Sequence, residues 1–238
     1  MLLEVAGLRK RFGSIVAAED LDLVVAPGEA VGIIGPNGAG KTTLFNLIAG
    51  TLSPNGGTIR LEGRDIARAA PQARCRAGVG RTHQIPQPFE KLTVFENLLV
   101  GAFHGRRKTE AAAAQSCGEI LDRLGLLKCA NTLAGSLTLL ERKRLEMARA
   151  LATEPRLLLL DEIAGGLTEA ECGELIATIR EIRATGVAIL WIEHVVHALL
   201  AVVDRLVVLN FGRKIAEGLP DEVMKSPEVH QIYIGIEA

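Results

Sequence analysis

The sequence has little that would place the chain inside a membrane or send it out of the cell. No apolar run approaches the ~18 residues that a helix needs to cross a bilayer. Residues 1–5 enter a strand-like pattern at once and lack the basic and apolar leader of a secreted protein. We therefore expect a soluble, cytoplasmic chain that reaches a membrane only through a partner.

An excess of one charge sign is also missing, because the formal net charge is −1. General nucleic-acid binders usually carry a strong basic excess, so the composition argues against a nucleic-acid partner. The basic cluster Arg106-Arg107-Lys108 is interpreted as a solvated loop rather than a nucleic-acid patch.

Cysteines are few and widely separated, at Cys75, Cys117, Cys129 and Cys172. They form no CxxC or CxH pair, so their spacing argues against a metal site or a disulfide framework. Reduced and mostly buried thiols are expected instead. The sequence also shows no internal repeat and no low-complexity segment.

The length of 238 residues and the 48% of hydrophobic residues allow one large α/β domain, or a core with a smaller lobe. Alternating apolar and polar residues predict a strand at 20–25, and a second strand is predicted at 58–61 between turn signals. Continuous apolar runs at 157–160, 187–192 and 206–209 are typical of a parallel sheet covered on both faces.

The middle of the chain, residues 86–140, carries no strand pattern and is predicted to be a helical lobe inserted in the core. Residues 1–85 and 141–238 would then form the α/β core of a single domain. Helices are expected at 94–100 and at 110–127. The second helix would bury one face, made of Ile120, Leu121, Leu124 and Leu127.

The most specific motif is the phosphate-binding loop pattern GxxxxGK[ST] at residues 35–42. A buried strand is predicted at 30–34 and a helix near Lys41, which is the context that the pattern requires. The glycines let backbone N–H groups turn around a polyphosphate, and the helix adds its positive dipole end. Lys41 would supply a cation to the β- and γ-phosphates, and the Thr42 hydroxyl would ligate Mg²⁺. The alternative is a glycine-rich turn with a chance lysine.

The sequence therefore predicts binding of a nucleoside triphosphate. The residues expected to bind ATP here are Gly35, Asn37, Gly38, Ala39, Gly40, Lys41, Thr42 and Thr43.

Two carboxylates, Asp161 and Glu162, follow the apolar run at 157–160. Ligands of open α/β sheets bind at the carboxyl ends of strands, so both acids should face the phosphate loop. Asp161 is predicted to hold Mg²⁺ through its water shell, and Glu162 to act as general base on the attacking water. The alternative is a solvated strand end, which acidic residues often mark.

Two further polar residues leave predicted strands. His194 follows the strand at 187–192 and is expected to donate a hydrogen bond to the γ-phosphate, unless it is merely structural. Gln84 follows residues 79–83, which lead from the core into the helical lobe, and is expected to reach Mg²⁺ and respond to movement of the lobe. The candidate catalytic residues are therefore Glu162, His194 and Gln84.

In this order of motifs, the whole chain resembles the ATP-binding subunit of an ABC transporter. Segments at 81–84, 92–98, 144–151, 192–194 and 229–235 are similar to the branched-chain amino-acid uptake branch. The resemblance implies an α/β fold: a P-loop NTPase core with a mostly parallel sheet, an N-terminal antiparallel β subdomain and an inserted helical lobe. It also implies hydrolysis of ATP with Mg²⁺.

The same resemblance gives Phe12 a role: it would stack on adenine, unless it is an ordinary core phenylalanine.

Partners are implied by the resemblance as well. A second ABC ATPase subunit would pair head to tail with this one, and membrane permeases would dock on the helical lobe through Gln84 and residues 85–89. A solute-binding protein would deliver the solute, with amino acids the first candidates. The chain would lie on the cytoplasmic face of the cell membrane.

The family's LSGGQ-like signature is degenerate here and is interpreted as Leu137 followed by Thr138, Leu139, Leu140 and Glu141. In the family this segment caps the ATP of the opposite subunit through a helix N-terminus and close backbone contact. We expect the Leu140 side chain to obstruct that approach and Glu141 to repel phosphate. A heterodimer with a relative that carries an intact glycine signature is therefore favoured over a homodimer.

A second departure lies at residues 163–168, IAGGLT, where the family usually has a proline first and an Asp or Asn near Thr168. The resemblance therefore does not extend to the communication between subunits at this segment. Three other functions stay open: a non-transport ABC ATPase, the ATPase of a lipid or lipopolysaccharide exporter, and a regulatory subunit that binds ATP but hydrolyses it poorly.

Overall fold

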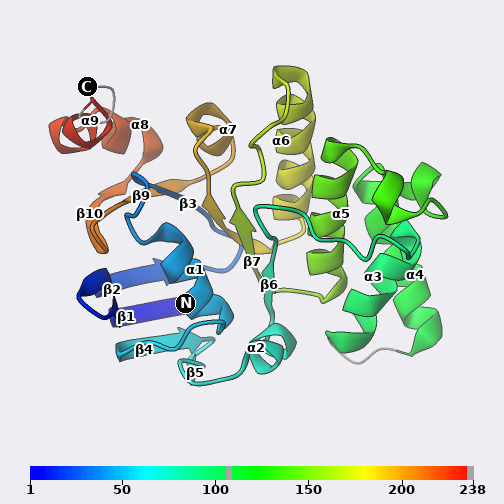
Figure 1. The fold of residues 1–238 in the computed structure, drawn as a ribbon, viewed down its shortest axis with the longest axis horizontal. Helices are drawn as coiled ribbons and strands as arrows, with labels where there is room; N and C mark the ends of the chain where they lie inside the picture. Colours follow the sequence, from blue (N-terminus) through cyan, green and yellow to red (C-terminus); the bar gives the residue numbers. More distant parts are fainter. Residues whose placement is uncertain (106–108, 235–238) are drawn as a thin grey trace.

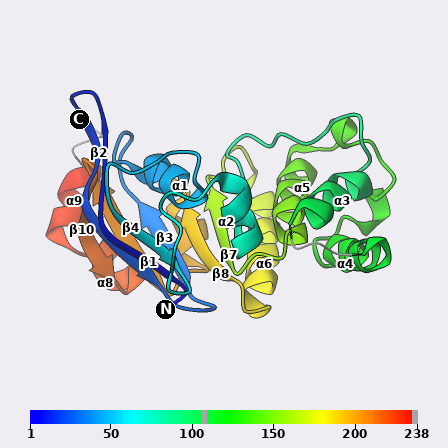
Figure 2. The same ribbon diagram turned by 90° about the horizontal axis from the view of Figure 1, so that it is seen from below.

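The computed structural model describes residues 1–105 and 109–234. The basic cluster at 106–108 and Gly235, which ends the similar tail segment, lie outside the described residues. The described strands form two sheets, and a group of helices stands at the other end of the molecule (Figures 1 and 2). None of the described helices is both long and apolar enough to cross a membrane.

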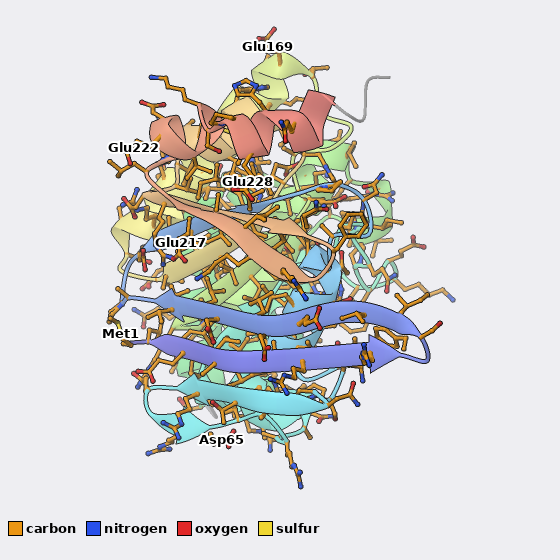
Figure 3. All side chains as sticks on the ribbon, turned by 90° about the vertical axis from the view of Figure 1, so that its left-hand side faces the viewer. Met1, Asp65, Glu169, Glu217, Glu222 and Glu228 are labelled. Carbon is orange, nitrogen blue, oxygen red and sulfur yellow. The ribbon has the colours of Figure 1, made fainter. Side chains whose placement is uncertain are left out.

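The N-terminal sheet is antiparallel and has the order β2-β1-β4-β5. Its strands are β1 (Leu3–Phe12), β2 (Ile15–Val25), β4 (Gly56–Leu61) and β5 (Arg64–Asp65). In β2, Leu21, Leu23 and Val25 are buried while the residues between them are exposed, as the alternation predicts. Figure 3 shows β2, β1 and β4 side by side, with the labelled Asp65 at the far edge.

The second sheet has the order β10-β9-β3-β8-β7-β6 and is parallel except for its edge strand β10. The mostly parallel core predicted from the apolar runs is thus confirmed, but β10 has no counterpart in that prediction. The strands are β3 (Ala30–Ile34), β6 (Val79–Arg81), β7 (Leu157–Asp161), β8 (Ala188–Ile192), β9 (Arg205–Asn210) and β10 (Arg213–Gly218).

The apolar runs are continuous because both faces of this sheet are covered. In β7, Leu157 and Leu159 join the core cluster shared with the N-terminal sheet and the helix after the phosphate loop. Leu158 and Leu160 join the cluster on the opposite face, together with Trp191 of β8. Every residue of β7 is buried, so the strand has no solvent-facing side to mark with polar residues.

The helices flank the parallel sheet and form the lobe. They are α1 (Lys41–Ala49), α2 (Pro71–Ala77), α3 (Val94–His104), α4 (Glu110–Arg123), α5 (Leu139–Ala152), α6 (Glu169–Ala184), α7 (Val196–Leu200), α8 (Pro220–Met224) and α9 (Pro227–Ile234), with short 3-10 turns η1 (Leu127–Cys129) and η2 (Ala134–Ser136). In the lobe, α3, α4 and α5 pack against one another, and α5 also packs against β6 and α6.

One expectation about the lobe is wrong. Leu127 does not lie on the buried face of α4, because the helix ends at Arg123 and Gly125 turns the chain with a φ of +67°. Leu127 is 52% exposed, whereas Leu121 and Leu124 are buried as expected. The lobe boundary at residue 140 stays a prediction, and α5 crosses it.

Sheet order decides where the predicted site residues meet. The parallel strands β3, β8, β7 and β6 are successive neighbours, so their carboxyl ends lie along one edge. The phosphate loop leaves β3, His194 follows β8, Glu162 follows β7 and Gln84 follows β6. Open α/β sheets bind their ligands outside the carboxyl ends of the strands, so these residues lie where a ligand is expected.

Candidate nucleotide-binding and catalytic site

The phosphate-binding loop connects the end of β3 to the start of α1. Gly40 precedes the helix with a φ of 99°, and a Cβ atom there would overlap the carbonyl oxygen of Ala17. Glycine meets both requirements because it has no Cβ. No described side chain caps α1, so the N–H groups of its first turn can bind an anion.

A cavity of 380 Å³ lies over this loop, within the range of about 300–1,000 Å³ found for small-molecule sites. Glu162 is part of its lining, while Gly35 is not and instead packs against the end of β9. The other residues predicted to bind ATP all line the cavity: Phe12, Asn37, Gly38, Ala39, Gly40, Lys41, Thr42 and Thr43.

Lys41 is a buried cation at the floor of this cavity. Its ammonium donates hydrogen bonds to the carbonyl oxygens of Gly35 at 2.6 Å and Pro36 at 3.0 Å. Burial lowers the pKa of Lys41, and the negative charges of Glu162 and Asp161 oppose that shift. The lysine of the loop therefore interacts electrostatically with Asp161 at the end of β7 and with Glu162 just after it.

Phe12 lies at the mouth of the cavity and is 45% exposed. The Lys10 ammonium lies 5.1 Å from the centroid of its ring. The ordinary core position that the sequence left open for Phe12 is therefore wrong. An accessible ring on the wall of a cavity suits stacking on a planar base, although stacking on adenine stays a prediction.

Glu162 links the predicted catalytic residues. Its Oε1 lies 2.8 Å from His194 Nε2, and Gln84 Nε2 donates a hydrogen bond to its Oε2. Its φ of 48° is uncommon for a residue other than glycine and turns the chain sharply after β7. The structure thus brings three side chains from three different loops into one cluster, of which only Glu162 also lines the cavity.

Asp161 is held by an arginine that the sequence analysis did not single out. Arg81 Nη2 donates to Asp161 Oδ2 at 2.9 Å, and Arg81 Nη1 donates to Asn46 Oδ1 at 2.6 Å. Both members of the ion pair are largely buried. Arg81 is the last residue of β6, and Asp161 is the last residue of the neighbouring strand β7. A basic residue at the end of one strand and an acidic residue at the end of the other were the sequence signal for this ion pair.

The oxygen atoms at this edge suit a hard divalent cation such as Mg²⁺. They are the hydroxyl of Thr42, the carboxylate of Asp161 and the amide oxygen of Gln84. The Gln84 amide nitrogen already donates to Glu162, which leaves its oxygen as the acceptor. Within residues 1–105 and 109–234 no group of three or more His, Cys, Asp or Glu could hold a metal ion.

The signature segment forms the start of α5, and its own side chains cap the helix. Thr138 caps the helix, its N–H donates to Glu141 Oε2 at 3.0 Å, and the Glu141 N–H donates to Thr138 Oγ1 at 3.3 Å. The same T-x-x-E capping box starts α3, with Thr93, and α6, with Thr168. This pattern was the sequence signal for a self-capped helix, in contrast to the uncapped α1.

The obstruction predicted for Leu140 is wrong, because its side chain is only 8% exposed and packs in the core. Leu139 is the exposed leucine, at 43%, and its side chain lies next to Gly166. In the first turn of a helix, successive side chains point about 100° apart, so the phase of the turn decides which leucine faces out. None of the signature residues lines the cavity over the phosphate loop.

A second cavity, of 540 Å³, lies between the core and the lobe. Residues of β6, α3, α5 and the loop at 83–89 line it. Phe89 is 45% exposed there, and the Arg149 guanidinium lies 4.9 Å from its ring centroid, so the ring is not enclosed within the lobe. Asn97 holds the loop by accepting from the Phe89 N–H and donating to its carbonyl oxygen.

Known proteins share this arrangement. Residues 18–165 match the ABC transporter family. The chain is 40% identical to the high-affinity branched-chain amino acid transport ATP-binding protein LivG of Escherichia coli, over 98% of both proteins. It is 35% identical to the lipopolysaccharide export system ATP-binding protein LptB of Acidithiobacillus ferridurans, over 98% of this chain and 97% of LptB.

A solved structure of the ADP conformation of an ATP-binding cassette from an ABC transporter superposes with a TM-score of 0.90. It is 33% identical and covers 98% of each chain. Taken with the phosphate loop and the cluster around Glu162, these similarities identify the protein by family. The chain belongs to the ABC transporter family and is one of its ATP-binding, ATP-hydrolysing subunits.

Proposed function

We propose that this chain is the ATPase subunit of an importer for branched-chain amino acids or similar small polar solutes. One observation carries the catalytic part: Glu162 contacts both His194 and Gln84 while it lines the same cavity as Lys41. The cargo is supported by the 40% identity with LivG over nearly the whole of both proteins.

ATP would bind over the uncapped start of α1. Lys41 would exchange its bonds to the carbonyl oxygens of the loop for phosphate oxygens, which carry more negative charge. Phe12 would stack on the adenine. Thr42, Asp161 and Gln84 would hold Mg²⁺, which neutralises charge on the phosphates when it is bound.

Glu162 is the proposed general base. Its carboxylate would accept the proton of the attacking water, and it stands on the cavity wall where that water would lie. His194 would hold the γ-phosphate and keep Glu162 oriented through the contact between Nε2 and Oε1. Arg81 would keep Asp161 in place by occupying one of its two carboxylate oxygens.

The cavity of 540 Å³ between core and lobe is the proposed docking site for a membrane permease. Asn97 holds the loop at 83–89 by a hydrogen bond to Phe89. The half-exposed ring of Phe89 lies against the Arg149 guanidinium, and aromatic and arginine side chains often contribute most of the binding energy at interfaces. Gln84, five residues before Phe89, would carry movement of the partner to Glu162. The chain would then lie on the cytoplasmic face of the membrane, with a solute-binding protein outside.

A heterodimer with a second ABC ATPase subunit is favoured by the start of α5. The Glu141 carboxylate already accepts from the Thr138 N–H and hydroxyl, so this helix start carries its own negative charge. It is a poor cap for a phosphate of the opposite subunit. The isolated chain should therefore bind ATP, stay largely monomeric and hydrolyse slowly, and brisk cooperative hydrolysis by the chain alone would contradict the heterodimer.

The ATPase of a lipopolysaccharide exporter is the second candidate, because LptB matches nearly the whole chain at 35% identity. An uptake assay separates the two. The chain would be expressed with the membrane proteins that copurify with it and placed in proteoliposomes with the matching solute-binding protein. ATP-dependent leucine uptake that is lost with Glu162→Gln supports the importer. Lipid-handling partners and no leucine uptake would reject it.

A further inference from the structure

Glu193 is a buried carboxylate that the proposed mechanism does not use. It follows the last residue of β8, precedes His194 and is only 2% exposed. A carboxylate is costly to bury unless hydrogen bonds compensate for the lost water. Its partners therefore indicate what it does for the fold.

The Glu193 carboxylate accepts hydrogen bonds from backbone N–H groups of two loops. Its Oε2 accepts from the N–H of Ala164 at 2.9 Å, two residues beyond Glu162. Its Oε1 accepts from the N–H of His194 at 2.9 Å and of Val195 at 3.3 Å. One oxygen thus holds the Glu162 loop and the other holds the His194 loop.

The same two loops also meet at the candidate catalytic atoms, where His194 Nε2 lies 2.8 Å from Glu162 Oε1. His194 has a side chain that is 47% exposed, so solvent can compete for that contact. The contact between Glu193 and the Ala164 N–H is buried and does not face this competition, and its contacts to the N–H groups of His194 and Val195 are partly buried. The buried carboxylate is therefore better placed than the exposed contact to set the spacing of the loops.

A buried cation on α5 faces the same carboxylate. Lys143 is 3% exposed, and burial lowers its pKa while the negative charge of Glu193 opposes that shift. Glu193 therefore interacts with a buried cation on α5, the helix that begins at the signature segment, and also lies between the two loops. In the proposed function the Glu162 and His194 loops surround the reacting end of this chain's own ATP, whereas the start of α5 faces the ATP of the opposite subunit.

We propose that Glu193 is a positioning residue that holds the Glu162 and His194 loops at the spacing required for ATP hydrolysis. Glutamine has the same shape but only one acceptor atom, so its NH₂ group would face one of the N–H donors. The link between the loops would then break without loss of packing. The proposal rests on the proposed roles of Glu162 and His194.

The test compares Glu193→Gln with a matched control, Glu29→Gln. Glu29 also accepts hydrogen bonds from a backbone N–H, that of Ala26, and from the Arg205 side chain. It directly precedes β3, however, and so lies at the amino ends of the parallel strands, away from the site. For the full-length variants, one measures single-turnover ATP hydrolysis, KM for ATP and hydrogen exchange at residues 162–166. If Glu193→Gln does not fold, Glu193→Asp replaces it under the same criteria.

We expect Glu193→Gln to exchange faster at residues 162–166 and to lose at least about tenfold in kcat, since misplacement by ~1 Å can cost about 10²-fold. KM for ATP should stay within about twofold, and Glu29→Gln should keep the wild-type kcat. In a Glu162→Gln background, Glu193→Gln should add less than about twofold, because it acts through Glu162.

Three results would overturn the proposal: an unchanged kcat despite faster exchange, a parallel change of kcat and KM, or full additivity with Glu162→Gln. A Glu162→Gln variant that hydrolyses ATP normally would instead reject the proposed role of Glu162. Failure of leucine uptake bears on the cargo alone, so the outcomes are distinct.

Discussion

Leu139 and Leu140 offer a matched pair of substitutions that tests how α5 begins. Both lie in the first turn of the helix, but Leu140 is 8% exposed and Leu139 is 43% exposed. Replacing a core leucine by alanine costs about 2–5 kcal/mol, and glycine instead of alanine in a helix adds about 1 kcal/mol. Leu140→Gly should therefore lose roughly 3–6 kcal/mol of the free energy of unfolding, a large part of a typical ~5–15 kcal/mol.

Leu139→Gly should cost far less, on the order of 1–2 kcal/mol, because it removes little buried surface. Urea denaturation of the two variants, followed by far-UV circular dichroism, measures both values. Equal losses would refute the reasoning, since they would mean that Leu140 is not packed in the core. Leu140 would then be an exposed side chain, as its position in the family signature suggests.

The same pair decides how a signature should be restored. A glycine at position 140 matches the family motif, but it would remove core packing before it could improve contact with a partner. Leu139→Gly with Glu141→Gln removes an exposed side chain and a charge, and glutamine still serves in a capping box. We expect the variant that combines Leu139→Gly with Glu141→Gln to raise the ATPase rate of the isolated chain. The gain is about tenfold if the Leu139 side chain and the Glu141 charge together raise the activation barrier of hydrolysis by ~1.4 kcal/mol.

Three further predictions concern single side chains. Lys41→Ala should lose about 2–4 kcal/mol of ATP affinity, because a charge-assisted contact is removed; titration with a fluorescent ATP analogue that finds binding within about threefold of wild type would reject the phosphate-loop assignment. Glu162→Gln should keep ATP binding and slow hydrolysis by roughly 10²–10⁴, as measured in single-turnover assays, and undiminished turnover would shift suspicion to His194. Phe89→Ala should leave basal hydrolysis nearly intact and reduce stimulation by the membrane permease by about tenfold or more; unchanged stimulation would place the docking site elsewhere.

The sequence by itself determined the parts of this protein that depend on neighbouring residues. A strand, a glycine loop and a helix follow one another at residues 30–49, and the predicted strand at 30–34 and helix start at Lys41 are confirmed. Glu162 and His194 are predicted as site residues because each follows an apolar strand, and parallel strands place such ends at one edge. The capping box of α5 is equally local, because Thr138 and Glu141 stand three residues apart in the T-x-x-E pattern.

Tertiary structure decided what depends on residues far apart or on the phase of a helix. Arg81 and Asp161 lie 80 positions apart and meet only because β6 and β7 are neighbours. The burial of Leu140 rather than Leu139 depends on how α5 packs, since one position rotates a side chain by about 100°. Local rules act over about four residues, whereas contacts between strand ends and the choice of a buried helix face are set by the packing of the whole domain.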